Sequence, residues 1–167
     1  GKIAHGRDAS LQVGFTVQRS RYKELTYWSE DESVGGTKNM PRTPNCYGYF
    51  TFTANPFKNF DFSLSGVYTG RMHVPHFAPT DEIPTDFPYT YIQKDELKHT
   101  PDFFDFNVKL NYNFVLNEHL KIQLNGGVQN IFNAFQKDLD KGMFRDSGYF
   151  YGPTQPRTFF LGIKIFN

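Results

Sequence analysis

The chain has 167 residues, a formal net charge of +1 and one cysteine, Cys46, and 18% of its residues are aromatic. The balanced charge excludes the basic surface of a nucleic-acid-binding protein, and one cysteine excludes both a disulfide framework and a multi-cysteine metal site. No run of apolar residues is long enough to form a transmembrane helix.

Six segments alternate between apolar and polar residues with a period of two, as half-buried β-strands do. In chain order they cover residues 10–22, 46–55, 60–74, 102–115, 119–132 and 157–167. In the second segment the phase stays open, because Tyr49 and Phe50 are adjacent bulky rings. No helical periodicity of useful length interrupts this series.

The fourth segment is the most regular of the six. Its apolar phase consists of Phe104, Phe106, Val108, Leu110, Tyr112 and Phe114. Its polar phase consists of Asp105, Asn107, Lys109, Asn111 and Asn113. One face of this strand must therefore meet an apolar environment and the other a polar one.

The connections alternate strictly between short and long. Residues 55–59 and 117–118 make two short links, whereas the links at about 29–44, 75–101 and 133–156 are long. Tight turns on one side and long loops on the other are typical of outer-membrane barrels, which also combine a polar interior with aromatic girdles. The mean hydropathy of −0.56 fits that combination. Five prolines in the middle loop predict that it holds no regular sheet: Pro75, Pro79, Pro84, Pro88 and Pro101.

Three features near the end of the chain resemble one protein family. Residues 128–133 read VQNIFN, the motifs Tyr151-Gly152-Pro153 and Pro156-Arg157-Thr158 precede the last segment, and that segment alternates to its end. Together they resemble the C-terminus of TonB-dependent outer-membrane receptors, most closely over residues 120–167. The loop at 137–152 is similar to that of receptors from the Bacteroides group. The chain departs from the family in its ending, Phe166-Asn167, where an aromatic residue is usual.

The resemblance implies an all-β, antiparallel transmembrane β-barrel, of which residues 1–167 would be the last six strands out of about 22. The plug domain, the energy-coupling box and the earlier strands would lie outside this chain. The implied function is active import of a scarce, bulky nutrient across the bacterial outer membrane: a ferric siderophore, haem or cobalamin. The implied partners are the rest of the receptor, the TonB complex, membrane lipid, lipopolysaccharide and a surface lipoprotein.

Candidate site residues follow from this layout, and no catalytic constellation is present, so we expect no enzyme. The apolar phase of the fourth segment would face lipid, and Asp105, Lys109 and Asn111 would face the lumen and the plug. Ligand contacts are expected near the outer opening from Arg71, His73, His76, Arg145, Tyr149 and Tyr151. Three loop carboxylates could hold calcium: Asp138, Asp140 and Asp146.

Two other classes of protein stay open at this point. A passive porin or an oligomeric barrel built from several six-stranded chains would share the alternation and the loops. A soluble carbohydrate-binding β-sandwich would explain the alternation but not the one-sided long loops, and it would have to protect its sheet edges.

Overall fold

The computed structural model describes residues 2–5, 8–79, 93–142, 145–153 and 155–166. Its main feature is one antiparallel sheet in the order β1-β2-β5-β6-β9-β10-β11. The strands of this sheet are β1 (Lys2–His5), β2 (Ala9–Val17), β5 (Cys46–Phe57), β6 (Phe60–Thr69), β9 (Phe103–Asn117), β10 (Leu120–Gln129) and β11 (Thr158–Phe166).

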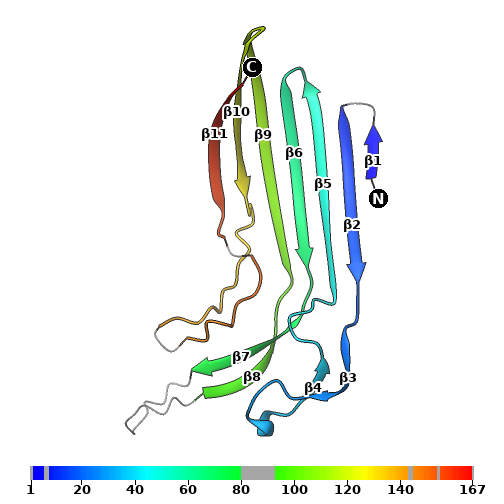
Figure 1. Ribbon diagram of the computed structural model, residues 1–167, viewed down its shortest axis with the longest axis vertical. Helices are drawn as coiled ribbons and strands as arrows, with labels where there is room; N and C mark the ends of the chain where they lie inside the picture. The colour runs from blue at the N-terminus through cyan, green and yellow to red at the C-terminus, as the bar shows by residue number, and fades with distance from the viewer. Residues whose placement is uncertain (1, 6–7, 80–92, 143–144, 154, 167) are drawn as a thin grey trace.

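The sheet is a single open layer with edges at β1 and β11 (Figure 1). The tight turns lie at one end of the strands and the long connections at the other, as the connection lengths predicted. Antiparallel all-β architecture is therefore confirmed, whereas closure of the sheet into a barrel is not a property of this chain by itself.

The strand register places the polar residues of each strand beside the polar residues of its neighbours. Ser65 pairs with Thr51 on one side and with Asn107 on the other, and Lys109 pairs with Ser63. On the far strands, Asn125 lies opposite Asn111 and Gly162. Because paired residues point to the same face, one face of the sheet is polar from β2 to β10.

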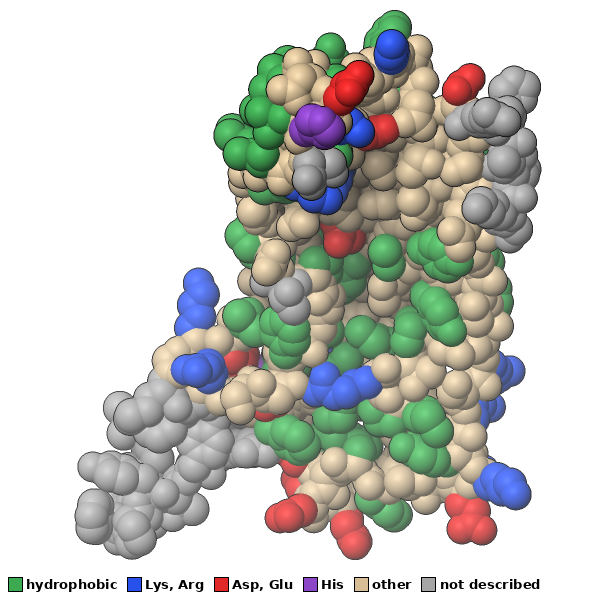
Figure 2. All heavy atoms as spheres, turned by 45° about the horizontal axis from the view of Figure 1, so that its top comes forward, with side chains coloured by type: hydrophobic (Ala, Val, Ile, Leu, Met, Phe, Trp, Pro, Cys, Tyr) green, Lys and Arg blue, Asp and Glu red, His purple; other side chains and the backbone are tan. Residues whose placement is uncertain are grey.

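The opposite face is apolar and uncovered. Leu64 pairs with Val108 and Phe52, and Leu124 pairs with Tyr112 and Ile163. Leu161 is 82% exposed and Phe159 73% exposed. Figure 2 shows hydrophobic side chains gathered beside the β9–β10 turn and acidic side chains at the end with the long connections. A β-sandwich would need a second layer here, and the described residues place none over this face.

The pairing of β5 settles the phase of the second segment. Phe50 and Phe52 lie on the apolar face, opposite Val13 and Leu11 of β2. Tyr47 and Tyr49 lie on the polar face, where the Tyr49 hydroxyl accepts a hydrogen bond from Gln12 Nε2 at 3.2 Å. Two adjacent rings therefore serve two different faces.

The main sheet differs from the predicted segments in strand number and bounds. β1 gives it a seventh strand, too short to leave a periodic signal. The first segment leaves the sheet after Val17, and the third after Thr69 rather than near residue 74. Gly70 allows that exit, because a Cβ there would lie 2.5 Å from Asn45 Oδ1 and 2.7 Å from Cys46 O.

The long connections contain regular structure that the prolines did not predict. β3 (Arg21–Thr26) pairs with β4 (Thr37–Asn39) in the first connection, which also holds a 3₁₀ turn at Glu32–Val34. β7 (His73–Pro79) pairs with β8 (Gln93–His99) in the second. The expectation of no sheet there is wrong: Pro75 lies within β7, because a two-stranded ribbon leaves each strand an edge where no N–H is needed. Pro84 and Pro88 lie outside the described residues.

No helix among the described residues is long and apolar enough to cross a membrane. The buried hydrophobic residues of the described chain are Val74, Phe103, Tyr149 and Tyr151, and all lie at the end with the long connections. The molecule thus has a thin sheet at one end and a compact loop core at the other.

Candidate functional site

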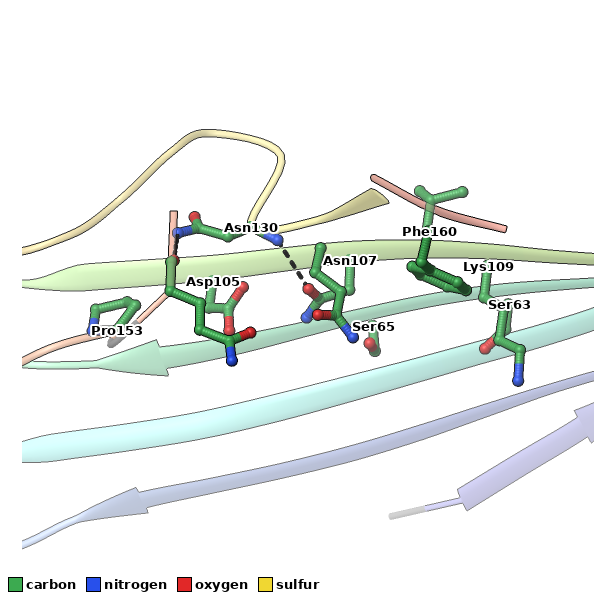
Figure 3. Close-up of a pocket in the computed structure, with 11 residues that line it drawn as sticks. Ser63, Ser65, Asp105, Asn107, Lys109, Asn130, Pro153 and Phe160 are labelled. Atoms are coloured by element: carbon green, nitrogen blue, oxygen red, sulfur yellow. Dashed lines mark hydrogen bonds between the residues drawn. The ribbon is translucent and has the colours of Figure 1, made fainter. Parts of the chain in front are cut away.

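The polar face of the main sheet carries a hollow of about 430 Å³ near the loop end. Its polar lining comes from three neighbouring strands and from the loop that follows β10 (Figure 3). The lining residues are Ser63, Ser65, Asp105, Asn107, Val108, Lys109, Gln129, Asn130, Pro153, Gln155 and Phe160. Gly127 leaves room for the ring of Phe160, because a Cβ at residue 127 would lie 2.7 Å from that ring.

Two acceptors on this face have no hydrogen-bond partner among the residues that the structure describes. Oδ1 of Asp105 and Oδ1 of Asn111 are both buried and unpaired. By contrast, Asn107 Oδ1 accepts from the backbone N–H of Asn130 at 2.9 Å (Figure 3). A buried acceptor left unpaired costs about 1–3 kcal/mol. These two oxygens are therefore open to a hydrogen-bond donor that the described residues do not supply.

Asn130, the third residue of the VQNIFN motif, organises the chain just after β10. Its φ is +49°, its side chain is buried, and its Nδ2 donates to the carbonyls of Ala134 and Gln155 at 2.9 and 2.7 Å. Its Oδ1 accepts from the N–H of Ala134 at 2.8 Å. Asparagine tolerates this left-handed backbone better than most residues. The motif therefore works as a turn that joins the last loop to the wall of the hollow.

A second group of side chains forms the loop core. The hydroxyls of Tyr149 and Tyr151 both donate to Asp138, the first to Oδ2 at 2.6 Å. Gln136, also buried, donates to the Tyr149 carbonyl at 3.2 Å and accepts from the Tyr151 N–H at 2.9 Å. Burial and the bond to Asp138 raise the pKa of Tyr151 to about 12 and raise that of Tyr149 further. Burial opposes ionisation of Asp138, but the two tyrosine donors outweigh it and lower the Asp138 pKa.

His76 joins this core to the β7–β8 hairpin. His76 is 6% exposed, and its ring stacks on Tyr149 with 3.7 Å between centroids. Nδ1 lies 3.1 Å from Glu96 Oε1, and Nε2 lies 2.8 Å from Asp140 Oδ2. Burial resists ionisation of Glu96, but Lys98 and His76 together lower the Glu96 pKa.

The structure brings some of the predicted site residues together and separates others. His76, Tyr149 and Tyr151 meet in the loop core with Asp138, Asp140 and Asp146 around them. The polar atoms of these side chains already have hydrogen-bond partners within the protein. Their contact with a ligand therefore stays a prediction. His73 does not pair with His76 but packs on His99, its opposite residue in β8, at 3.9 Å between ring centroids. Burial and the neighbouring imidazole lower the His73 pKa.

The two predicted arginines lie outside the loop core. Arg71 is exposed and lies 4.0 Å from Asp102 Oδ1, a separation typical of a weak surface ion pair. Arg145 is exposed and donates to the carbonyl of Gly142 at 3.2 Å. Neither meets the other predicted ligand contacts.

The calcium hypothesis depends on three carboxylates that already accept hydrogen bonds within the chain. Asp146 accepts from the N–H groups of Phe77 and Gly148 at 3.0 and 2.7 Å, and Asp140 faces His76. Within the part of the chain that the structure describes, no three His, Cys, Asp or Glu side chains converge as a metal site would require. Calcium binding therefore stays an untested prediction.

Sequence reasoning missed several residues on which the loop core depends. Arg42, with φ +58°, donates to the carbonyls of Gly148 and Phe150, and its own N–H donates to His73 O at 2.7 Å. Glu96 faces His76 across the hairpin. No local pattern marks these partners, because the pairs are separated by 20 to 108 residues.

Comparison with known proteins adds one fold likeness. No family model matches the chain, and no curated protein matches it. Among solved structures, the chain is similar to the ferric-catecholate import receptor Fiu from K12 E. coli in its closed form, with a TM-score of 0.55 and 22% identity. The likeness covers 96% of this chain and 19% of that one. The chain thus spans about a fifth of that receptor, and at this identity the likeness shows the fold alone.

Proposed function

We propose that this chain is a wall segment of a TonB-dependent outer-membrane receptor that imports a ferric siderophore of the catecholate class. The observation that carries the proposal is the continuous separation of polarity, with one face polar across the paired strands and the other apolar and bare. Lipid is the environment that accepts an exposed face of this kind, and a sheet in lipid must close because its edges find no hydrogen-bond partner there.

The open edges at β1 and β11 fit the same proposal. In lipid, β1 would pair with an earlier strand of the same receptor and β11 would meet the first strand of the barrel. The polar face would then line the lumen, and the unpaired oxygens of Asp105 and Asn111 would accept donors from the plug. The partners are therefore the rest of the receptor inside the barrel, and lipid and lipopolysaccharide outside it.

The cargo assignment is supported by the fold likeness to a ferric-catecholate import receptor. That neighbour is an import receptor, and the likeness to it supports a transport role for this chain. Binding at the outer side would precede movement of the plug, with energy delivered through TonB.

Site-directed spin labelling tests the membrane topography directly. Cysteines are placed one at a time at 104–114 in the protein expressed from its full gene, with Cys46→Ser as background. Accessibility to oxygen, which partitions into lipid, should peak at the even positions, and the odd positions should be shielded or reached by a polar reagent. Loss of the period of two would contradict the strand phase itself. A period of two in a protein that does not associate with membranes, with the even positions shielded from oxygen, would support the soluble sandwich instead.

Uptake of radioactive iron tests the cargo. A strain that lacks the gene should lose accumulation of iron from a ferric catecholate, while uptake from ferric citrate is unchanged. Haem and cobalamin serve as the two further arms. Selective loss in either of those arms would reassign the cargo, and energy-independent uptake of small solutes would favour the porin.

A further inference from the structure

The three long connections of the chain lie at the same end of the main sheet (Figure 1). The ring of Trp28, in the first connection, packs against Phe77 of β7 in the second, with 6.1 Å between centroids. The N–H of Phe77 in turn donates to Asp146 of the last loop at 3.0 Å. Contacts of this kind join the connections in pairs, whereas one residue, Arg42, contacts all three.

Arg42 belongs to the first connection and reaches both of the others. Its backbone N–H donates to the carbonyl of His73, the first residue of β7, at 2.7 Å. One terminal nitrogen of its guanidinium donates to the Phe150 carbonyl at 3.0 Å, and the other donates to the Gly148 carbonyl. These two carbonyls flank Tyr149, whose ring is almost fully buried in the loop core. The backbone of Arg42 thus holds the second connection, and its side chain holds the last loop.

The local chain fixes Arg42 in a conformation that serves this three-way contact. Its φ is +58°, in the left-handed region that a non-glycine residue keeps only where neighbouring contacts hold it. Pro41 precedes Arg42 and Pro44 follows two residues later, and their rings restrict the rotation of the chain on both sides. The arginine fork offers two donors in fixed directions, whereas the ammonium of a lysine is a single point charge.

We infer that Arg42 is a clasp that makes the three long connections open and close as one unit. With both guanidinium bonds formed, movement of the last loop out of the loop core carries the first connection with it. Because the Arg42 N–H bonds the first residue of β7, the β7–β8 hairpin is drawn along as well. The clasp is independent of which cargo is imported and of whether the sheet faces lipid.

Hydrogen exchange of the full-length protein tests the clasp with one reporter amide in the first connection and one in the last loop. The reporters are Asn45 N–H, which donates to the Arg71 carbonyl, and Tyr149 N–H, which donates to the Asp146 carbonyl, both at 3.1 Å. In Arg42→Ala both amides should exchange about tenfold faster or more, because two bonds from a charged donor are lost. Amides in the paired region of β6 and β9 should exchange at the rate of the unchanged protein.

Three further variants isolate the guanidinium as the cause. Arg42→Gly relieves the backbone at positive φ but deletes the guanidinium, so both reporters should accelerate as in Arg42→Ala. Arg42→Lys keeps the charge without the fork and should also accelerate both. Arg145→Ala removes an exposed arginine that bonds only to Gly142 of its own loop among the described residues, and should leave both rates within about twofold.

Acceleration of both reporters in every Arg42 variant, with the sheet amides and Arg145→Ala unchanged, would support the clasp. Acceleration at Tyr149 alone would mean that Arg42 fastens the last loop without coupling it to the first connection, and would overturn the proposal. An unchanged rate at Tyr149 in Arg42→Gly, or equal acceleration of the sheet amides, would overturn it as well.

Discussion

The main sheet and the loop core are stabilised in different ways. In the sheet, strands are held by backbone pairing, and large apolar residues such as Phe15 and Ile163 are 66% exposed. In the loop core, Val74 and Tyr149 are almost fully buried, and nearly every polar side chain has a named partner. The apolar side chains of the sheet are therefore left uncovered by the described chain, whereas those of the loop core are buried by neighbouring loop residues.

The largest difference between the regions should appear on truncation of matched tyrosines. Tyr149→Ala removes a ring that is 1% exposed, with its bond to Asp138, and should destabilise the loop core by about 3–5 kcal/mol. Tyr47→Ala removes a ring of the polar face that is 43% exposed and should cost less than about 1 kcal/mol. The loss of stability in Tyr149→Ala is measured by hydrogen-exchange protection of residues 145–153, and that in Tyr47→Ala by urea unfolding. Equal losses of stability in the two variants would remove the distinction between the regions.

The junction between the two regions should respond to loss of the Asn130 side chain. Asn130→Gly keeps a backbone that tolerates positive φ but deletes three hydrogen bonds, which should cost about 1–3 kcal/mol. Gln129→Ala, one residue earlier and exposed, should change stability by less than about 0.5 kcal/mol. Thermal unfolding measures both, and a neutral Asn130→Gly would mean that the motif has no part in stability.

A smaller effect separates the regions in acid. Because the Asp138 pKa is lowered below its ordinary value of 3.8, its stabilising effect is complete above that value and is lost as pH falls through the lowered pKa. Proteolysis of the last loop at about pH 3 should therefore accelerate relative to about pH 6, while the strands stay protected. Tyr151→Phe, which lacks one of the two donors to Asp138, should show a weaker dependence on acid. The same acid dependence in Asp138→Asn would contradict this explanation.

Sequence reasoning succeeded in the sheet and failed in the loop core for one physical reason. Period-two alternation is a local pattern, so Phe104 to Phe114 could be given to one face before their partners were known, and the register agrees with that phase. The phase of β5 needed its neighbours, because Tyr49 and Phe50 look alike in isolation. The hairpins β3–β4 and β7–β8 were missed because short ribbon strands carry little periodicity and tolerate proline.

The candidate site shows the same limit. Tyr149, Tyr151 and Asp138 could be nominated from composition, and they do lie together. Gln136, which bonds the backbone of Tyr149 and Tyr151, could not be nominated in this way. Nor could Arg42, which donates to Gly148 and Phe150, or Glu96, which faces His76, because a charged residue in a loop gives no sign of a contact far away in the chain. The pairing of His73 with His99 rather than His76 follows from a strand register that no local spacing predicts.

Charge placed on opposite faces of β9 tests the central claim most directly. Leu110→Lys puts a cation on the apolar face, and Asn107→Lys puts the same cation on the polar face, where Lys109 already lies. With the full-length protein folded in lipid vesicles, urea unfolding should show a loss of about 2–4 kcal/mol for Leu110→Lys. Asn107→Lys should lose less, about 1 kcal/mol for its single bond to Asn130. Equal losses at the two positions, or a larger loss at Asn107, would contradict a lipid-facing apolar surface.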